Sequence, residues 1–484
     1  MRAFFPVFKA FGMLMMVFGL IMLVPIGVSM TQADGAEGAF DEAMAVTLAT
    51  GFLLWLLTRK DKRELKTRDG FLLVAMVWTF LPVFASIPLQ LHLGLSFTDA
   101  YFEAVSGLTA TGATLLSGLD DLPISINFWR TFLHWIGGMG VIVLAVAILP
   151  MLGVGGRQIF KAEMPGPVKE ANLSPRITET ARGFWVIYIV FTVACALMFQ
   201  LAGMGGWDAV MHAFSVMGLG GLSTKDASLG HFNSVEIELV AMFFALISGI
   251  SYVSHYLALH GRSWRAYRRD VELPFYLGVL AASILGLTLY LMAFDVYPDF
   301  ATAVRYVAFH CISLATSLGF ATTDYAQWPM FAQLWILFLG SFAACSGSTG
   351  GGIKMVRAII LYKQVFREIL RSMHPRVVQP IKLAGNPVPG DIIYAVLAFG
   401  FIYMVSIVSL TLAMSASGLD IVTSFSAVVA CINNTGPGLN LVGPSSTYAV
   451  LSDFQTWLCA FAMLLGRLEI FTLLVVLSPA FWRK

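Results

Sequence analysis

Charged residues are scarce in this chain. Asp, Glu, Lys and Arg make up 12% of its 484 residues, whereas hydrophobic residues make up 58% and the mean hydropathy is +0.79. Soluble domains carry roughly 25% charged residues, so the composition excludes an ordinary soluble protein. Apolar runs of roughly 18 residues or more recur along the sequence, and such runs cross a bilayer as helices. The chain is therefore predicted to be an all-α integral membrane protein with the lipid bilayer as its surroundings.

The sequence also lacks the spacings that mark metal, redox or catalytic centres. Its five cysteines form no C-x-x-C pair, which argues against a zinc site and a disulfide framework. The apolar spans contain no paired carboxylates. One glycine-rich stretch, CSGSTGGGIK at 345–354, invites comparison with a phosphate-binding loop, but Ile353 stands where that loop requires lysine. An enzyme is therefore not expected.

Basic residues are unevenly placed along the chain. Of the 30 Lys and Arg, 26 lie near the two chain ends or in clusters at 59–68, 157–182, 262–269 and 354–382. The segments between the clusters lean acidic; residues 31–42, for example, hold four acids and no base. By the positive-inside rule, both termini and every basic cluster are predicted to be cytoplasmic. No A-x-A site follows the first apolar run, so it is interpreted as an uncleaved helix.

Apolar segments of two lengths alternate along the chain. Full spans are predicted near 11–30, 43–58, 71–91, 128–152, 184–203, 235–260, 273–294, 331–363, 391–413 and 454–480. Shorter outward segments lie at 97–118, 207–226, 303–324 and 421–440. Each of these is too short to span and too apolar for an ordinary loop. Each is predicted to be a re-entrant half-helix of roughly 10–14 residues that runs into a glycine turn.

Four glycines at these turns reveal an internal repeat. Gly112, Gly221, Gly319 and Gly436 are separated by 109, 98 and 117 residues, and each interval holds one inner span, one basic cluster and one outer span. The predicted architecture is four helix–pore-helix–filter–helix repeats in a pseudo-fourfold arrangement around one pore. The predicted boundaries are 1–68 for an N-terminal helix pair and 69–182, 183–270, 271–388 and 389–484 for the repeats, the third with a broken inner helix.

The glycine turns suggest a cation filter. Non-helical backbone survives at membrane depth only where protein or water satisfies its polar groups, and four turns meeting on an axis would meet that requirement. The half-helices would direct the negative ends of their dipoles inward. Glycine permits left-handed angles that turn successive carbonyls toward the axis, as in a potassium filter. The alternative is that the glycines only allow close helix packing.

Six stretches occur in a characteristic order: SGLTATGAT, VMGLGGLST, SLATSLGFATTD, SGSTGGGIK, NNTGPG and LLGRLEIFTLLVVLSP. Together they resemble the TrkH/KtrB/HKT superfamily of potassium transporters over essentially the whole chain, and the extra N-terminal helix pair is similar to that of the TrkH family. The resemblance implies potassium held by the backbone carbonyls of filter residues. Those residues are Thr109, Ala110, Thr111, Gly112, Leu219, Gly220, Gly221, Ser317, Leu318, Gly319, Asn434, Thr435 and Gly436.

The resemblance carries further expectations. In branches that favour sodium the first filter glycine is often serine, so four glycines favour potassium, with rubidium also passing. It implies uptake across the bacterial inner membrane, a homodimer, and a cytosolic TrkA-like regulatory ring that binds NAD(H) or ATP. No covalently bound cofactor and no nucleic-acid partner is expected on this chain. A proton- or sodium-coupled potassium symporter remains the alternative, although such sites usually rely on inverted repeats.

The glycine-rich stretch is predicted to be a gate. It interrupts the third inner helix, and the sequence indicates that only this inner helix is broken. The resemblance makes it an intramembrane gating loop of Cys345, Ser346, Gly347, Ser348, Thr349, Gly350, Gly351 and Gly352. Passive slack between two packed half-helices is the alternative. The five cations that follow are interpreted mainly as a solvated positive-inside face, or as contacts to a partner: Lys354, Arg357, Lys363, Arg367 and Arg371.

Arg467 lies near the middle of the last predicted span. A mid-helix arginine costs roughly 2.5–3.5 kcal/mol on insertion scales and faces an interior or a water path. The resemblance suggests a positive barrier below the filter, and a structural ion pair with another helix is the alternative. Glu469 lies roughly 200° away around a helix, so it is not expected to be the partner.

Polar residues in the half-helices have simpler interpretations. His212 and His310 are expected to pack or hydrogen-bond rather than bind metal. Four aspartates near the helix starts are expected to cap backbone N–H groups: Asp99, Asp208, Asp299 and Asp420. The side chains of Asn433 and Asn434 are expected to brace the fourth turn.

Overall fold

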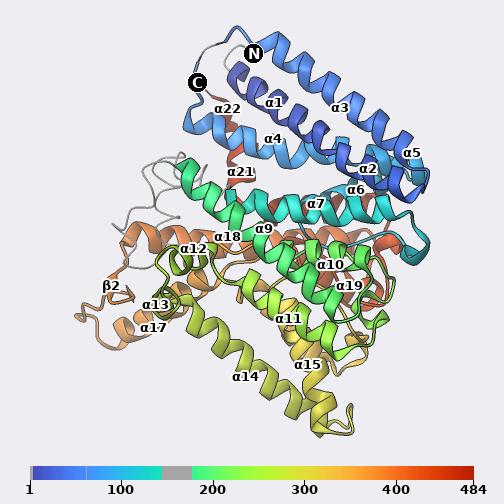
Figure 1. Cartoon of the computed structure of the whole chain (residues 1–484). Coiled ribbons are helices and arrows are strands. Elements are labelled where there is room, and N and C mark those ends of the chain that lie inside the picture. Colours follow the sequence, from blue (N-terminus) through green and yellow to red (C-terminus); the bar gives the residue numbers. More distant parts are fainter. Residues whose placement is uncertain (1–3, 62, 144–176, 484) are drawn as a thin grey trace.

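The computed structural model describes the whole chain except residues 1–3, 62, 144–176 and 484. Figure 1 shows long helices that run side by side in a bundle, with the two described ends of the chain near each other. Within the described residues, strand structure is limited to a hairpin of β1 (Lys382–Leu383) and β2 (Asn386–Pro387). The prediction of an all-α membrane protein is confirmed.

The N-terminal extension consists of three helices. α1 (Phe5–Ile21) and α2 (Leu23–Gln32) form one span, and α3 (Glu37–Thr58) packs back against α1. A Cβ placed on Gly12 would lie 2.7 Å from the Gly51 carbonyl oxygen, and one on Gly51 would lie 2.8 Å from that of Gly12. Small residues thus let the two backbones approach, as in other membrane helix pairs. α1 begins before the predicted span 11–30, and α3 begins before the predicted span 43–58.

The helices that follow fall into four groups, each of which contains one of the predicted half-helices. The first group is α4 (Thr67–Ala85), α5 (Ile87–Leu93), α6 (Phe97–Leu108) and α7 (Ile124–Val143). The second group is α9 (Ile177–Leu201), α10 (Gly206–Gly218), α11 (Val235–Gly249) and α12 (Tyr252–His260). The third group is α13 (Arg265–Arg269), α14 (Glu272–Ala293), α15 (Phe300–Ala315), α16 (Met330–Phe342) and α17 (Met355–Met373). The fourth group is α18 (Gly390–Ala416), α19 (Ile421–Ile432), α20 (Asp453–Arg467), α21 (Phe471–Leu477) and α22 (Pro479–Trp482).

The four predicted half-helices are α6, α10, α15 and α19. They contain 12, 13, 16 and 12 residues, so only α15 exceeds the expected length. Each is buried along its C-terminal half and ends at a predicted glycine turn. Longer helices pack against each of them, for example α7 against α6 and α10, α14 against α15, and α18 against α19.

The expectation of a single broken inner helix is wrong. α16 and α17 are separated by the glycine-rich stretch, as predicted, but α11 and α12 are bent by 89° and α20 and α21 by 113°. Non-glycine residues make the last break, since Glu469 and Ile470 have φ of 52° and 54°. Glycine content alone therefore does not locate the breaks, and Arg467 is the last residue of α20 rather than a mid-helix residue.

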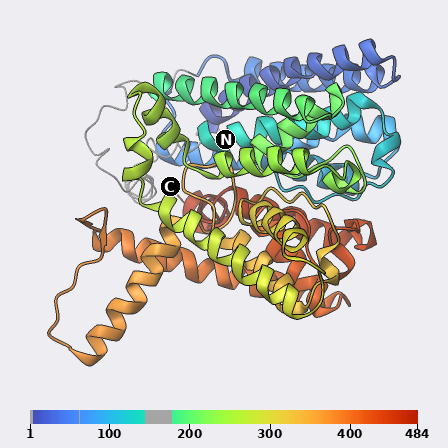
Figure 2. The ribbon, with the colours of Figure 1, turned by 60° about the horizontal axis from the view of Figure 1, so that its bottom comes forward.

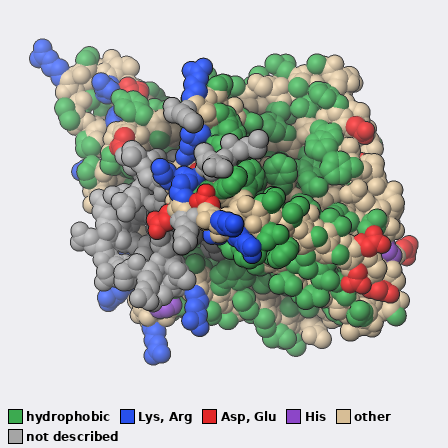
Figure 3. All heavy atoms as spheres, turned by 90° about the horizontal axis from the view of Figure 1, so that it is seen from above, with side chains coloured by type: hydrophobic (Ala, Val, Ile, Leu, Met, Phe, Trp, Pro, Cys, Tyr) green, Lys and Arg blue, Asp and Glu red, His purple; other side chains and the backbone are tan. Residues whose placement is uncertain are grey.

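Six helices in the described part are long and apolar enough to cross a membrane, or eight if each bent pair is one span. Figure 3 shows a broad band of hydrophobic side chains on one face of the molecule. Lys and Arg gather toward one end of this band, whereas Asp and Glu mark the other end. The end of the predicted span 128–152 and the basic cluster from 157 to 176 lie outside the described residues.

Candidate functional site

The four glycine turns share one backbone conformation. In each, the residue two positions before the glycine is left-handed, with φ of 50°, 52°, 61° and 52° at Ala110, Leu219, Ser317 and Asn434. The glycines follow with φ of 85°, 77°, 80° and 91° at Gly112, Gly221, Gly319 and Gly436. Left-handed angles are costly for non-glycine residues and cluster at functional sites. Four copies of this conformation show that the repeat seen in the sequence is also a repeat of backbone geometry.

One hydrogen bond recurs where each short helix ends. The N–H of the residue before the glycine donates to the carbonyl five residues earlier, at 2.7–3.0 Å. The pairs are Thr111 to Ser106, Gly220 to Ser215, Leu318 to Ser313 and Thr435 to Ala430. This bond closes the last helical turn and satisfies one of its orphan carbonyls. It fixes where the chain leaves the helix in all four turns.

The turns touch one another in cyclic order. A Cβ placed on each glycine would collide with a carbonyl oxygen of the next turn, in the pairs Gly112 to Gly220, Gly221 to Leu318, Gly319 to Thr435 and Gly436 to Thr111. In every pair the carbonyl belongs to the residue just before the next glycine. The glycines are therefore required both by positive φ and by close backbone approach. The contacts close into a ring that starts and ends at the first turn.

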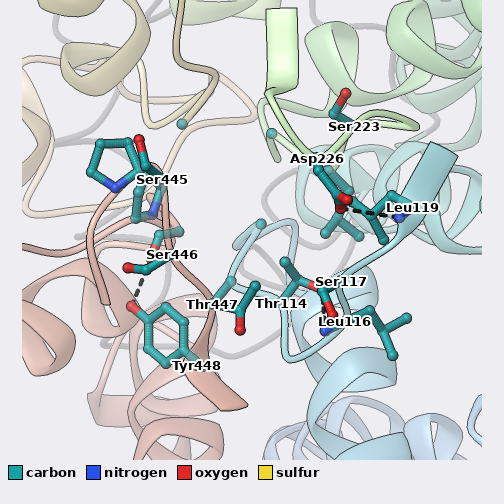
Figure 4. A pocket seen from close by; sticks show the side chains of 18 of the residues that line it. Thr114, Leu116, Ser117, Leu119, Ser223, Asp226, Ser445, Ser446, Thr447 and Tyr448 are labelled. Carbon is teal, nitrogen blue, oxygen red and sulfur yellow. Dashed lines mark hydrogen bonds between the residues drawn. The ribbon is translucent and has the colours of Figure 1, made fainter. Parts of the chain in front are cut away.

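A cavity of about 310 Å³ opens beside this ring and is lined by all four glycines. Figure 4 shows its wall, which is built by residues from separate parts of the chain, including Thr114, Ser223, Asp226 and Tyr448. The Tyr448 hydroxyl donates to the Gly436 carbonyl at 2.7 Å, and the Tyr448 N–H donates to the Thr114 carbonyl at 2.8 Å. The cavity thus forms a vestibule whose floor is the ring of turns.

The ring of turns consists of backbone carbonyl groups in close contact rather than of acidic side chains. Within the described residues, no group of three or more His, Cys, Asp or Glu side chains lies close enough together to hold a metal ion. Carbonyl oxygens can replace the hydration shell of a monovalent cation. Four helices end at the ring, and the negative ends of their dipoles favour positive charge there.

A buried ion pair, which sequence analysis missed, supports the first turn. Glu103 and Arg130 are 1% exposed each, and Arg130 Nε lies 3.3 Å from Glu103 Oε2. Glu103 Oε1 accepts hydrogen bonds from the Leu115 N–H at 2.5 Å and the Thr114 hydroxyl at 2.6 Å. Arg130 also donates to the Thr114 hydroxyl at 3.0 Å. Together the two charges hold the chain directly after Gly112.

The histidines occupy the same place in their turns as Glu103 does in the first. Each of the three lies nine residues before its glycine. His212 Nε2 lies 3.0 Å from the Ser223 hydroxyl, and the Thr322 N–H donates to His310 Nε2 at 3.3 Å. The expectation of a hydrogen-bonding role is therefore confirmed. The same repeat alignment contained the signal that could have identified Glu103.

Replacing Glu103 by glutamine is expected to destabilise the protein by about 3–5 kcal/mol, because it leaves the Arg130 charge buried without its counter-ion. Glutamine keeps a side-chain oxygen that can accept the hydrogen bonds of Thr114 and Leu115. The loss of stability is therefore due mainly to the loss of the negative charge. The measurement is the thermal unfolding midpoint in detergent. Glu238→Gln is the matched control, because Glu238 pairs with a more exposed arginine, Arg305, at 2.7 Å. Equal shifts for both variants would contradict a special role for the buried pair.

The prediction of aspartate caps is confirmed for two helices and wrong for two. Asp299 and Asp420 accept from the Thr302 and Thr423 N–H groups, each at 2.9 Å. The Thr302 N–H holds the pKa of Asp299 below its ordinary value, because it stabilises the carboxylate. In α6 and α10 the N-caps are Ser96 and Gly205, because Asp99 and Asp208 lie three residues into those helices.

Asparagine side chains brace the fourth turn, as expected. Asn434 Nδ2 donates to the Thr111 hydroxyl at 2.9 Å and to the Met463 carbonyl at 3.1 Å. Asn433 accepts from the Tyr403 hydroxyl at 2.8 Å and donates to the Ser341 hydroxyl at 2.9 Å. The fourth turn is thereby linked by a side chain to the first turn.

A histidine that sequence analysis did not single out lies behind the second turn. His134 is fully buried, and a Cβ on Gly220 would overlap its ring. Its Nδ1 lies 3.5 Å from the Ser215 hydroxyl, which itself donates to the Leu222 carbonyl at 2.6 Å. Gly220 is not among the glycines with positive φ, so it is the imidazole behind it, rather than the backbone angle, that requires glycine.

The glycine-rich stretch lies against the inner side of the turns. The Gly351 N–H donates to the Ser317 hydroxyl at 2.8 Å, and the Thr349 hydroxyl donates to the Met217 carbonyl at 3.1 Å. A Cβ on Gly351 would overlap the Asn433 carbonyl. The segment 345–352 therefore touches the ends of three short helices, α10, α15 and α19. It lies at the C-terminal ends of these helices, where the turns begin.

Arg467 holds this segment in place. Its guanidinium donates to the Thr349 carbonyl at 3.0 Å and to the Gly137 carbonyl of α7 at 2.9 Å, and its side chain is 4% exposed. It thus joins the third and first inner helices through neutral oxygens. Within the described residues it has no carboxylate partner, so the ion-pair alternative is not supported. Glu469 instead pairs with Arg357 at 2.7 Å.

The first two of the five cations after the glycine-rich stretch do not lie on a solvated face, so the expectation is wrong for them. Lys354 and Arg357 are 6% and 3% exposed. Lys354 is left-handed, with φ of 75°, and its ammonium donates to the Gly350 carbonyl. Arg357 lies over the Phe399 ring, 4.3 Å from its centroid. Both cations therefore belong to the internal packing beside the segment 345–352 rather than to the surface.

The chain is similar to known cation transport proteins over nearly its whole length. The family model described as "TrkH: Cation transport protein" matches residues 37–484. The chain is 44% identical over 475 residues to the Trk system potassium uptake protein TrkH of Salmonella typhimurium and to that of Escherichia coli, with 98% of each chain covered. The crystal structure of the potassium transporter TrkH from Vibrio parahaemolyticus matches with a TM-score of 0.91 and 40% identity, covering 99% of this chain and 100% of that one.

Proposed function

The chain belongs to the TrkH family of cation transport proteins, and from this premise we propose that it takes up potassium through a pore whose filter is the ring of four glycine turns. The observation that carries the proposal is the cyclic contact of each glycine with the carbonyl before the next glycine. Such a ring presents backbone oxygens to a cation at the base of the vestibule. Relatives named potassium uptake proteins support potassium as the ion.

The proposed filter residues are those predicted from the sequence, in a pseudo-fourfold pore of four repeats. Potassium would be held by carbonyl oxygens and would need no side-chain ligand. The similar left-handed geometry of the four turns supports this assignment. Rubidium, which has nearly the same size, would share the path.

The segment 345–352 and Arg467 are proposed to close this pore from below. The segment's contacts with the ends of α10, α15 and α19 support this role, as does the positive charge of Arg467 beside it. Opening would require the segment to leave these contacts. The helix α17 continues directly from it and provides a lever.

The proposed setting is the bacterial inner membrane with both termini in the cytoplasm. We propose a homodimer regulated by a cytosolic TrkA-like ring that binds NAD(H) or ATP. The names of the relatives, which refer to a Trk system, support further components. Any nucleotide would bind to that ring and not to this chain.

The proposal is tested by rubidium uptake into proteoliposomes that contain the purified chain. We expect uptake to follow the rubidium gradient alone, to be reduced by potassium, and to be little affected by equal sodium. Liposomes without protein provide the baseline. Uphill uptake driven by an imposed proton or sodium gradient would instead establish the symport alternative. Equal competition by sodium and potassium would contradict the filter.

A further inference from the structure

A second cavity, of about 420 Å³, lies between α17 and the β1–β2 hairpin. Its wall combines aromatic side chains with cations, namely Tyr362, Phe366, Lys363, Arg367 and Lys382. The Lys363 ammonium donates to the Lys382 carbonyl at 2.8 Å and so ties the hairpin to the helix. Figure 2 shows this helix and the hairpin beyond it standing clear of the main bundle.

One face of α17 is apolar and exposed. Tyr362, Val365, Phe366 and Ile369 are 63%, 57%, 55% and 50% exposed, and they recur at helical spacing. Lysine and arginine side chains lie on the same helical turns, beside this apolar face. A helix with aromatic and aliphatic side chains on one face and Lys or Arg on the other is typical of a segment at the membrane interface.

The position of α17 agrees with that setting. The helix begins at Met355, beside the segment beneath the ring, and Arg367 is twelve residues further on. At roughly 1.5 Å per residue, this residue lies roughly 18 Å along the helix. Half of the hydrocarbon core is roughly 15 Å thick, so an oblique course from the membrane interior brings the cations to the level of the head groups.

The charges at the cavity are incompletely neutralised. Arg367 Nε is buried and has no hydrogen-bond partner within the described residues. The nearest carboxylate, Glu368, lies 3.5 Å from Arg367 and 3.4 Å from Arg371, and it also accepts from Gln364. One exposed carboxylate is thus shared between two guanidinium groups and an amide. A guanidinium and two ammonium groups in one cavity wall are well suited to a phosphate.

We infer that this cavity binds the phosphate head group of an anionic membrane lipid, with the acyl chains lying along the exposed apolar face of α17. The cations of Arg367, Lys382 and Lys363 would contact the phosphate, while Tyr362 and Phe366 would contact the upper acyl chain. The inference does not depend on which ion the protein carries. Because α17 continues from the segment 345–352, such a lipid would sit on the helix proposed to move that segment.

The test measures lipid retention by the purified full chain with native mass spectrometry, comparing phosphatidylglycerol with phosphatidylcholine. We expect clear preference for phosphatidylglycerol. The double variant R367Q/K382Q should lower that preference about ten- to thirty-fold, as expected when two basic groups near a lipid surface are lost. The matched control is R371Q/R376Q, which removes two exposed cations of the same region outside the cavity and should change the preference less than about two-fold.

Three results would overturn the inference. One is an equal loss of preference in both double variants, which would indicate only a diffuse effect of charge. A second is unchanged retention in R367Q/K382Q, which would assign the cavity to another occupant such as a soluble protein. The third is displacement of the lipid by millimolar inorganic phosphate, which would identify a site for soluble anions. Rubidium uptake is not part of this readout, so failure here is distinguishable from failure of the proposed pore.

Discussion

Replacing Gly112 by serine is expected to remove most discrimination between potassium and sodium while the protein remains folded. The residue has φ of 85°, and a Cβ there would overlap the Gly220 carbonyl of the next turn. That carbonyl must move, so one of the four oxygen positions at the ring is displaced. Local strain of about 1–3 kcal/mol corresponds to about a five- to 150-fold change in the selectivity ratio. Sodium competition against rubidium uptake measures the change.

Gly94→Ser is the matched control for this variant. Gly94 also has positive φ, 67°, but a Cβ there would have nothing within 4 Å. It therefore imposes the strain of a left-handed serine without a clash at the ring. We expect normal selectivity with a modestly lower unfolding temperature. Full potassium preference in Gly112→Ser would show that the ring is not the filter.

Replacing Arg467 by alanine is expected to give the largest gain in flux without a regulatory partner. The guanidinium donates to the carbonyls of Thr349 and Gly137, so its removal frees the segment beneath the ring. It also removes a positive charge. A unit charge within roughly 8 Å of a passing cation raises its energy by about 2 kcal/mol at an effective dielectric constant of about 20, which is about thirty-fold in rate. Rubidium uptake by the chain alone measures the effect.

Two further variants separate the effect of the Arg467 charge from the effect of its hydrogen bonds to the segment and to α7. Arg467→Lys keeps the charge but loses the two-pronged donor geometry, so we expect flux between those of the original protein and Arg467→Ala. Deletion of 347–351 removes the segment and keeps the charge, and it should also give flux without a partner. Size-exclusion profiles establish that each variant is folded. Unchanged flux in all three folded variants would refute the gate.

The sequence predicted the turns because each carries its own local signal. A short apolar helix, a small-residue turn and a glycine recur at similar intervals, and glycine is required at each turn by positive φ. Four copies made the signal readable without tertiary information. The helix breaks were harder to predict. Glu469 and Ile470 take left-handed angles in an apolar sequence that carries no breaker, so the bend after Arg467 results from tertiary contacts.

Partners of charged residues could not be predicted for the same reason. Glu103 and Arg130 are 27 positions apart, and Arg357 and Glu469 are 112 apart. Only the folded chain brings such residues together. Lys354 and Arg357 were expected on a solvated face because charge count alone indicates only the side of the membrane. Both donate to carbonyls that need partners in a region shielded from bulk water, Lys354 to Gly350 and Arg357 to Ile353.

Anomalous X-ray scattering from crystals grown with rubidium in place of potassium tests the central claim most directly. The account predicts a peak enclosed by the carbonyl oxygens of Thr111, Gly220, Leu318 and Thr435, at the base of the vestibule. In Gly112→Ser that peak should weaken, whereas in Gly94→Ser it should remain. Rubidium bound only at side-chain carboxylates, with no peak at the ring of turns, would contradict the assignment of the filter.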